Sequence, residues 1–144
     1  MGASFDGKVG PLPRAVAAGG STLTAASAPI HRPDGYGRAE SECGDTIEIS
    51  VAVDAGVITR SAFQLTGCAF TLLCGRAAAE IIPGKTIAEA RRLTAPALIA
   101  AALEGLPEAN AHCAELASQA VAEALTDAAA NTVEPWKKHY RRLT

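Results

Sequence analysis

Three cysteines lie where one expected secondary-structure element gives way to the next. Cys43 comes just before a long strand and two residues before Asp45. Cys68 stands at a strand-to-helix junction, and Cys113 follows His112 in the first turn of the last helix. Thiolates bind iron–sulfide and zinc, and they can also act as nucleophiles. These cysteines, with the carboxylate and the imidazole beside them, are the candidates for chemistry in this chain.

The spacing of the cysteines leaves their role open. None of the three belongs to a CxxC pair, and separations of 25 and 45 residues require the fold to bring them together. A cysteine in a chain that is 49% hydrophobic can also be a small core residue. Cys74 fits that description, because it lies about 240° around a helix from Cys68 and shares an apolar stripe with Phe70 and Ile81.

Position relative to helix starts predicts an order of thiol acidity. The first turn of a helix stabilises a thiolate at both Cys113 and Cys68, and the neighbouring His112, when protonated, places Cys113 first. Cys43 has no such helix, and the nearby Asp45 opposes its ionisation. We therefore expect Cys113 to form a thiolate most readily, Cys68 next and Cys43 last, when no metal is bound.

The elements that must position these residues follow from the hydropathy pattern. Apolar and polar residues alternate over residues 46–54, a turn follows at 54–56, and a second strand runs over 57–65, with a short third strand expected at 38–42. The apolar period then becomes that of a helix, and helices are expected over residues 68–81, 86–93, 94–105 and 111–130. A Thr86–Glu89 capping box would begin the second of these helices, and Asn110 would cap the last. Strands followed by helices predict an α+β fold, a small antiparallel sheet of about three strands with helices packed on one face and a long C-terminal helix.

Composition divides the chain and excludes some classes of protein. Residues 1–35 are rich in Gly and Pro and predict a flexible arm with one short helix near 14–18, residues 36–132 form the expected domain, and residues 133–144 form a basic and aromatic tail. Thirteen basic against fifteen acidic residues give a net charge of −2, which argues against nucleic-acid binding. No apolar run approaches the roughly 20 residues that span a bilayer, and no signal peptide is evident. We therefore expect a cytoplasmic protein with reduced cysteines and no membrane partner.

The motifs together resemble a known family. Cys-Gly-Asp before a strand, Gly-Cys before a helix and His-Cys opening the last helix are similar, in order and spacing, to the iron–sulfur cluster assembly scaffolds of the IscU and NifU N-terminal type. The resemblance runs from about Tyr36 to Ala130. It implies a scaffold, and no turnover enzyme, that assembles a 2Fe-2S cluster and passes it to apoproteins.

The resemblance also implies roles for individual residues. Cys43, Cys68 and Cys113 would bind the cluster or its iron, Asp45 and His112 would complete the coordination or tune release, and Cys113 would accept persulfide sulfur. A cysteine desulfurase and apo iron–sulfur proteins would be the partners. Residues 106–110 stand where family members carry the Leu-Pro-Pro-Val-Lys segment recognised by a dedicated Hsp70-type chaperone, and their different sequence argues against that partner.

Two other functions use the same residues. A cysteine-dependent sulfurtransferase would use Cys113 as nucleophile and His112 as its base. A zinc-binding interaction module would use the three thiolates with one Asp or His in a tetrahedral site, and zinc could also occupy the site of an isolated scaffold. Anaerobic reconstitution with iron and sulfide separates the alternatives, because only the scaffold should yield a 2Fe-2S spectrum.

Overall fold

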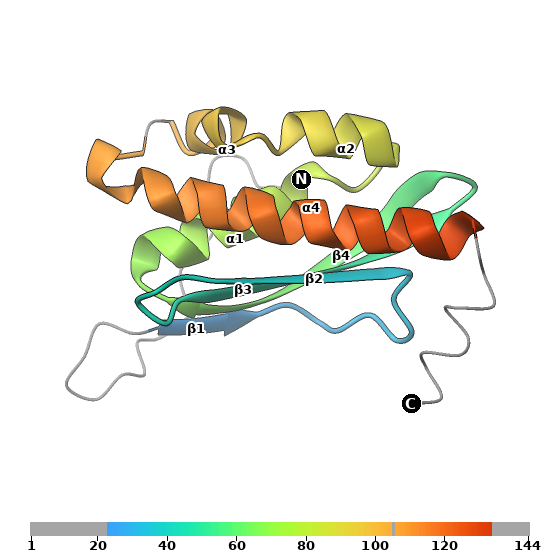
Figure 1. Cartoon of the computed structure of the whole chain (residues 1–144), viewed down its shortest axis with the longest axis horizontal. Coiled ribbons are helices and arrows are strands. Elements are labelled where there is room, and N and C mark those ends of the chain that lie inside the picture. Colours follow the sequence, from blue (N-terminus) through green and yellow to red (C-terminus); the bar gives the residue numbers. More distant parts are fainter. Residues whose placement is uncertain (1–22, 105, 134–144) are drawn as a thin grey trace.

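The computed structural model describes residues 23–104 and 106–133. Four strands come first, and helices follow (Figure 1). In chain order the elements are β1 (Leu23–Ala26), β2 (Gly35–Glu40), β3 (Thr46–Asp54), β4 (Val57–Gly67), α1 (Ala69–Ile81), α2 (Ile87–Leu93), α3 (Pro96–Ala102), the 3-10 turn η1 (Glu108–Asn110) and α4 (Ala111–Val133). The expected α+β fold with a long last helix is confirmed.

The sheet is antiparallel throughout and has the order β1-β4-β3-β2. The expected three strands were one too few, because Leu23–Ala26 pairs with the end of β4. The expected arm of residues 1–35 therefore extends too far along the chain, since β1 and the first residue of β2 belong to the sheet. The helix expected near residues 14–18 and the tail from residue 134 lie outside the described residues.

The central hairpin forms as the alternation predicts. Ile47, Ile49 and Val51 of β3 are completely buried, while the residues between them are only partly covered. The connecting turn uses Ala55 and Gly56, both with positive φ, as tight hairpins require. This hairpin forms the middle of the sheet and presents one apolar face to the helices.

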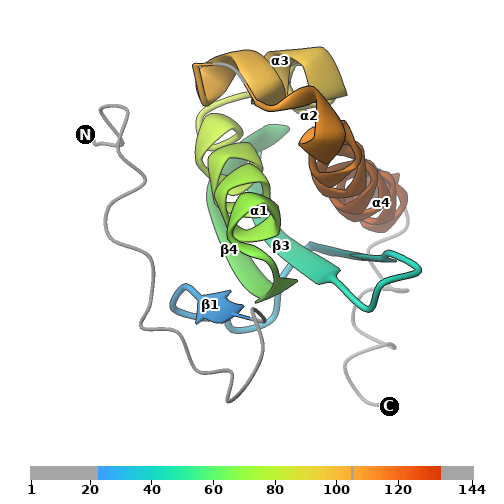
Figure 2. The ribbon, with the colours of Figure 1, turned by 90° about the vertical axis from the view of Figure 1, so that its left-hand side faces the viewer.

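Helices cover a single face of the sheet in two layers. Helices α1 and α4 lie directly on the sheet, and α2 and α3 lie above them (Figures 1 and 2). Helix α4 approaches β2 unusually closely, because a Cβ atom at Gly35 or Gly37 would overlap the α4 backbone near Ala124 and Ala120. The pairing of small residues on both elements fixes the position of α4 against the sheet.

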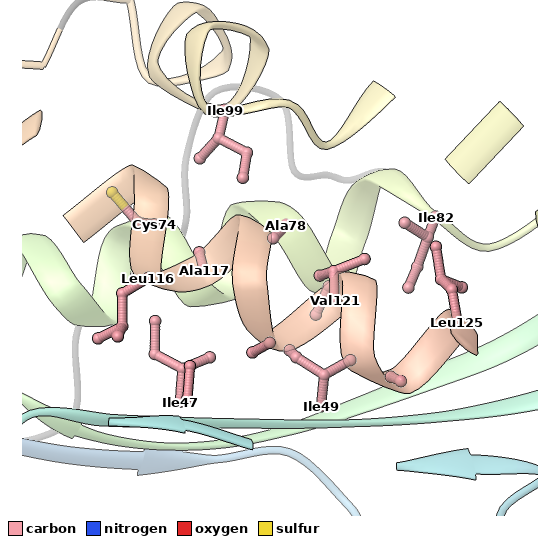
Figure 3. Close-up of a cluster of buried hydrophobic side chains, with 14 of the residues drawn as sticks. Ile47, Ile49, Cys74, Ala78, Ile82, Ile99, Leu116, Ala117, Val121 and Leu125 are labelled. Carbon is pink, nitrogen blue, oxygen red and sulfur yellow. The ribbon is translucent and has the colours of Figure 1, made fainter. Parts of the chain in front are cut away.

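The core between these layers consists of aliphatic and small side chains. Buried residues of β3, α1 and α4 interdigitate, and Ile99 closes the cluster from α3 (Figure 3). The Thr86–Glu89 capping box is confirmed by both of its hydrogen bonds. The start of α4 differs from the expectation of a simple Asn110 cap, since η1 runs directly into the helix. Within the described ranges, no helix is both long and apolar enough to cross a membrane.

Candidate functional site

The expected site residues come from three places at one end of the sheet. The turn 41–45 joins β2 to β3, Gly67 ends β4 just before α1, and Cys113 lies near the start of α4. The register pairs Thr46 with Thr66, so Asp45 lies beside Gly67. A Cβ atom on Gly67 would be 2.8 Å from Cγ of Asp45. The absence of a side chain at Gly67 therefore makes room for the Asp45 carboxylate.

The turn that carries Cys43 and Asp45 is held by Ser41. The Ser41 hydroxyl accepts hydrogen bonds from the backbone N–H groups of Cys43, at 3.2 Å, and of Asp45, at 3.1 Å. The Ser41 N–H in turn donates to the carbonyl of Asp45 at 2.8 Å, and Gly44 supplies a φ of +94°. Because both backbone groups are anchored, the turn fixes where the Asp45 side chain leaves the chain.

A buried hydroxyl joins three of the candidate side chains. Thr71 donates a hydrogen bond of 2.7 Å from Oγ1 to Oδ2 of Asp45. The same oxygen lies 3.5 Å from Sγ of Cys68 and 3.5 Å from Sγ of Cys113. Asp45, Cys68 and Cys113 therefore meet around Thr71, although they come from a turn, the N-cap of α1 and the start of α4.

The two thiols at Thr71 differ in acidity, opposite to the order expected from helix position. At Cys68 burial raises the pKa, but the Thr71 hydroxyl and the nearby backbone N–H groups of Thr71 and Phe70 favour the thiolate by more and lower the pKa below its usual range. At Cys113 burial raises the pKa and outweighs the help of Thr71, and the charges of Cys68 and Asp45 raise it further. The expectation that Cys113 is the more acidic of these two thiols is wrong for this arrangement.

His112 and Cys43 occupy the outer part of the site. His112 is exposed, and its Nε2 lies 3.6 Å from Sγ of Cys113, which is completely buried. Cys43 is exposed on its turn, and within the described residues no hydrogen bond joins its thiol to the group around Thr71. An entirely exposed site is therefore not found, and the convergence of Cys43 with the other two cysteines stays a prediction.

The donor atoms suit a metal or a cluster, but their present arrangement is not a finished binding site. Thiolate sulfur, imidazole nitrogen and carboxylate oxygen are the ligands of iron–sulfur and zinc centres. Among the residues described here, no three His, Cys, Asp or Glu side chains are already placed to hold a metal ion. Asp45, Cys68 and Cys113 are nevertheless gathered around the Thr71 hydroxyl.

Cys74 belongs to the core, as its position on the helix predicts. Its side chain is completely buried in the cluster between the sheet and the helices (Figure 3). Burial, with smaller contributions from the charges of Cys113 and Cys68, raises the pKa of Cys74 to about 12. A thiol that resists ionisation in this way is a packing residue.

Sequence reasoning missed Thr71. The available signal is its place three residues after Cys68 at the start of α1, since residues three apart lie on the same face of a helix. The contacts with Asp45 and Cys113 have no sequence signal, because they depend on how the turn and α4 meet α1.

Comparison with known proteins agrees with the fold and the motifs. Residues 22–134 match the family described as NifU-like N terminal domain. The chain is 38% identical over 99 residues to iron-sulfur cluster assembly scaffold protein IscU 1 of Archaeoglobus fulgidus, a match that covers 68% of this chain and 64% of the relative. It is 36% identical over 85 residues to the nitrogen fixation protein NifU of Nostoc, covering 58% of this chain and 28% of that protein. The chain thus spans less than two thirds of the length of these curated relatives.

A solved structure supports the same architecture. The N-terminal part of a nitrogen-fixing NifU-like protein from Brucella abortus superposes with a TM-score of 0.56 at 19% identity, covering 70% of this chain and 83% of that one. At this identity the likeness concerns the fold alone.

Proposed function

We propose, from the premise that this chain belongs to the NifU-like N-terminal domain family, that it is a scaffold on which a 2Fe-2S cluster is assembled and from which it is passed to apoproteins. The observation that carries the proposal is the meeting of Asp45, Cys68 and Cys113 at one end of the sheet. The curated relative from Archaeoglobus fulgidus bears the name of such a scaffold. The chain would act as a binding and assembly protein and not as a turnover enzyme.

The proposed ligands of this cargo are Cys43, Cys68 and Cys113, with Asp45 or His112 completing the coordination. A mixed ligand set supports transfer, because a carboxylate is a harder and more labile ligand for soft metal ions than a thiolate. The exposure of Cys43 supports the same function, since a ligand at the surface is within reach of a donor or an acceptor protein.

Sulfur delivery is assigned to Cys113. In this step the Cys113 thiolate attacks the outer sulfur of a cysteine persulfide on a cysteine desulfurase. A new S–S bond forms on Cys113, the old S–S bond breaks, and the desulfurase cysteine leaves as a thiolate. Because Cys113 is buried, the step requires the start of α4 to open when the desulfurase docks. The partners are thus a cysteine desulfurase and apo iron–sulfur proteins, and the proposed location is the cytoplasm.

Anaerobic reconstitution with ferrous iron and sulfide tests the proposal. The wild-type chain should develop the visible spectrum of a 2Fe-2S cluster, Cys68→Ala should not, and Cys74→Ala should behave as wild type because Cys74 is a core residue. Absence of the spectrum in the wild-type chain would refute the scaffold function. Binding of zinc alone would then favour the interaction module, and sulfur transfer without a cluster would favour the thiol enzyme.

The proposed role of Asp45 has its own test. Asp45→Ala should lengthen the life of the bound cluster and slow its transfer, measured as the decay of visible absorbance in the presence of an apo-acceptor. Faster loss from Asp45→Ala than from wild type would instead make Asp45 an essential anchor.

A further inference from the structure

We infer that Thr71 is a positioning residue of this site: its hydroxyl holds the side chains of Asp45, Cys68 and Cys113 close together before any metal arrives. The inference rests on the proposed function, because these three side chains are its proposed ligands. Thr71 itself contributes no ligand atom.

The first argument is the burial of the Thr71 hydroxyl. Thr71 is completely buried in α1, and burying a hydroxyl that has no hydrogen-bond partner destabilises the fold. A valine of nearly the same shape would pack there without that requirement. The hydroxyl at this position is therefore best explained by the contacts that it makes.

The second argument is that the contacts use the whole capacity of the hydroxyl. A threonine hydroxyl has one hydrogen to donate and two lone pairs that accept. The hydrogen is directed to Oδ2 of Asp45 at 2.7 Å. In the two contacts of 3.5 Å, to Sγ of Cys68 and of Cys113, either atom can be the donor, so the three contacts equal in number the three positions that a hydroxyl offers. Within the part of the chain that the structure describes, the partners of this hydroxyl are thus all proposed ligands.

The third argument is topological. The three ligands come from a turn between strands, from the N-cap of α1 and from the start of α4, and Thr71 contacts all of them from the first turn of α1. Cys68 is fixed by its own helix, but Asp45 and Cys113 lie on other elements. The hydroxyl therefore supplies one shared contact between the three elements at the point where they meet.

The test compares Co(II) binding to the metal-free chain in four variants, under anaerobic conditions. Groups that orient metal ligands usually change metal affinity by 10–100-fold when they are removed. Thr71→Val should therefore raise the Kd for Co(II) by about 10–100-fold and weaken the sulfur-to-cobalt charge-transfer absorption. Thr71→Ser keeps the hydroxyl and should bind within about threefold of wild type, a rescue that a purely structural role of the side chain would not predict.

A second buried threonine supplies the matched control. Thr94 is 2% exposed and donates from Oγ1 to the carbonyl of Ala90 at 2.8 Å, away from the proposed ligands. Thr94→Val should lower the melting temperature and leave Co(II) affinity unchanged. If Thr71→Val does not fold, Thr71→Ala serves as the variant without a hydroxyl, because alanine suits a helix and adds no volume.

Three results would overturn the inference. The first is that Thr71→Val or Thr71→Ala binds Co(II) with wild-type affinity. The second is that Thr71→Ser loses as much Co(II) affinity as Thr71→Val, and the third is that the wild-type chain binds no Co(II). Failure of the scaffold function is a separate outcome, because it is measured by 2Fe-2S formation in the wild-type chain. The ratio of Co(II) affinities between variants and wild type measures the role of Thr71 alone.

Discussion

Replacement of Gly67 by alanine should damage the site and the fold together. Gly67 has a φ of +155°, in a region that L residues occupy at a cost of about 1–3 kcal/mol. The added Cβ would also lie 2.8 Å from Cγ of Asp45 and 3.0 Å from Cβ of Thr71. Overpacking of this kind costs about 1–3 kcal/mol. Asp45 could escape by turning away, but it would then lose its charged hydrogen bond to Thr71, worth about 1.5–3 kcal/mol. The sum for Gly67→Ala is therefore about 2–6 kcal/mol.

A second glycine separates the backbone cost from the crowding. Gly56 also has a positive φ, of +82°, but a Cβ there would meet nothing within 4 Å. Gly56→Ala should lose about 1–2 kcal/mol in urea unfolding, and Gly67→Ala at least about 1 kcal/mol more. At about 4 °C per kcal/mol, this extra loss should appear as a lower melting temperature. Equal losses in the two variants would refute the conclusion that Asp45 is packed over Gly67.

Three further outcomes follow from the packing and the thiol chemistry. In the metal-free Cys43→Ser background, iodoacetamide should alkylate Cys68 before Cys113, as mapped by mass spectrometry, and the reverse order would contradict the acidity assigned to these thiols. Gly37→Ala should unfold at lower urea by about 1–3 kcal/mol, because its Cβ would overlap the α4 backbone; an unchanged midpoint would show that α4 can shift. Burial raises the pKa of the Cys74 thiol to about 12, against an ordinary value of 9.0. Its contribution to the free energy of unfolding is therefore complete below pH 9 and is lost as pH rises toward 12. Cys74→Ala should flatten that decline in unfolding free energy, and an unchanged decline would assign it to other groups.

Local patterns predicted the parts of the fold that depend on neighbouring residues. The alternation over β3 gives its buried face directly, and the capping box at Thr86 needs only a residue three positions away. Strand β1 was not predicted because it is only four residues long, Leu-Thr-Ala-Ala, and carries little apolar surface. It becomes a strand through pairing with β4, a long-range contact that its own sequence does not encode.

The candidate site was predictable in its residue types but not in its centre. Three cysteines at the boundaries of expected elements, two of them near Asp45 or His112, made Cys43, Cys68 and Cys113 candidates from the sequence alone. Thr71 could not be chosen in this way, because threonine is common near the start of a helix. Its importance arises only when the turn and α4 bring Asp45 and Cys113 to its hydroxyl.

The reversed acidity of Cys68 and Cys113 shows which physical effect dominates at this site. Both thiols lie at helix starts, where the dipole is worth about 0.3–1 kcal/mol at an exposed position. Burying an ion without a full set of partners costs several kcal/mol, so complete burial of Cys113 outweighs its helix, whereas half-buried Cys68 keeps the advantage. Helix position therefore ranks thiols only when their exposure is equal. It follows that the proposed sulfur delivery to Cys113 would have to begin with exposure of this thiol. If the proposal holds, the small-molecule alkylation pattern of the free chain should differ from the pattern of sulfur left by a docked desulfurase.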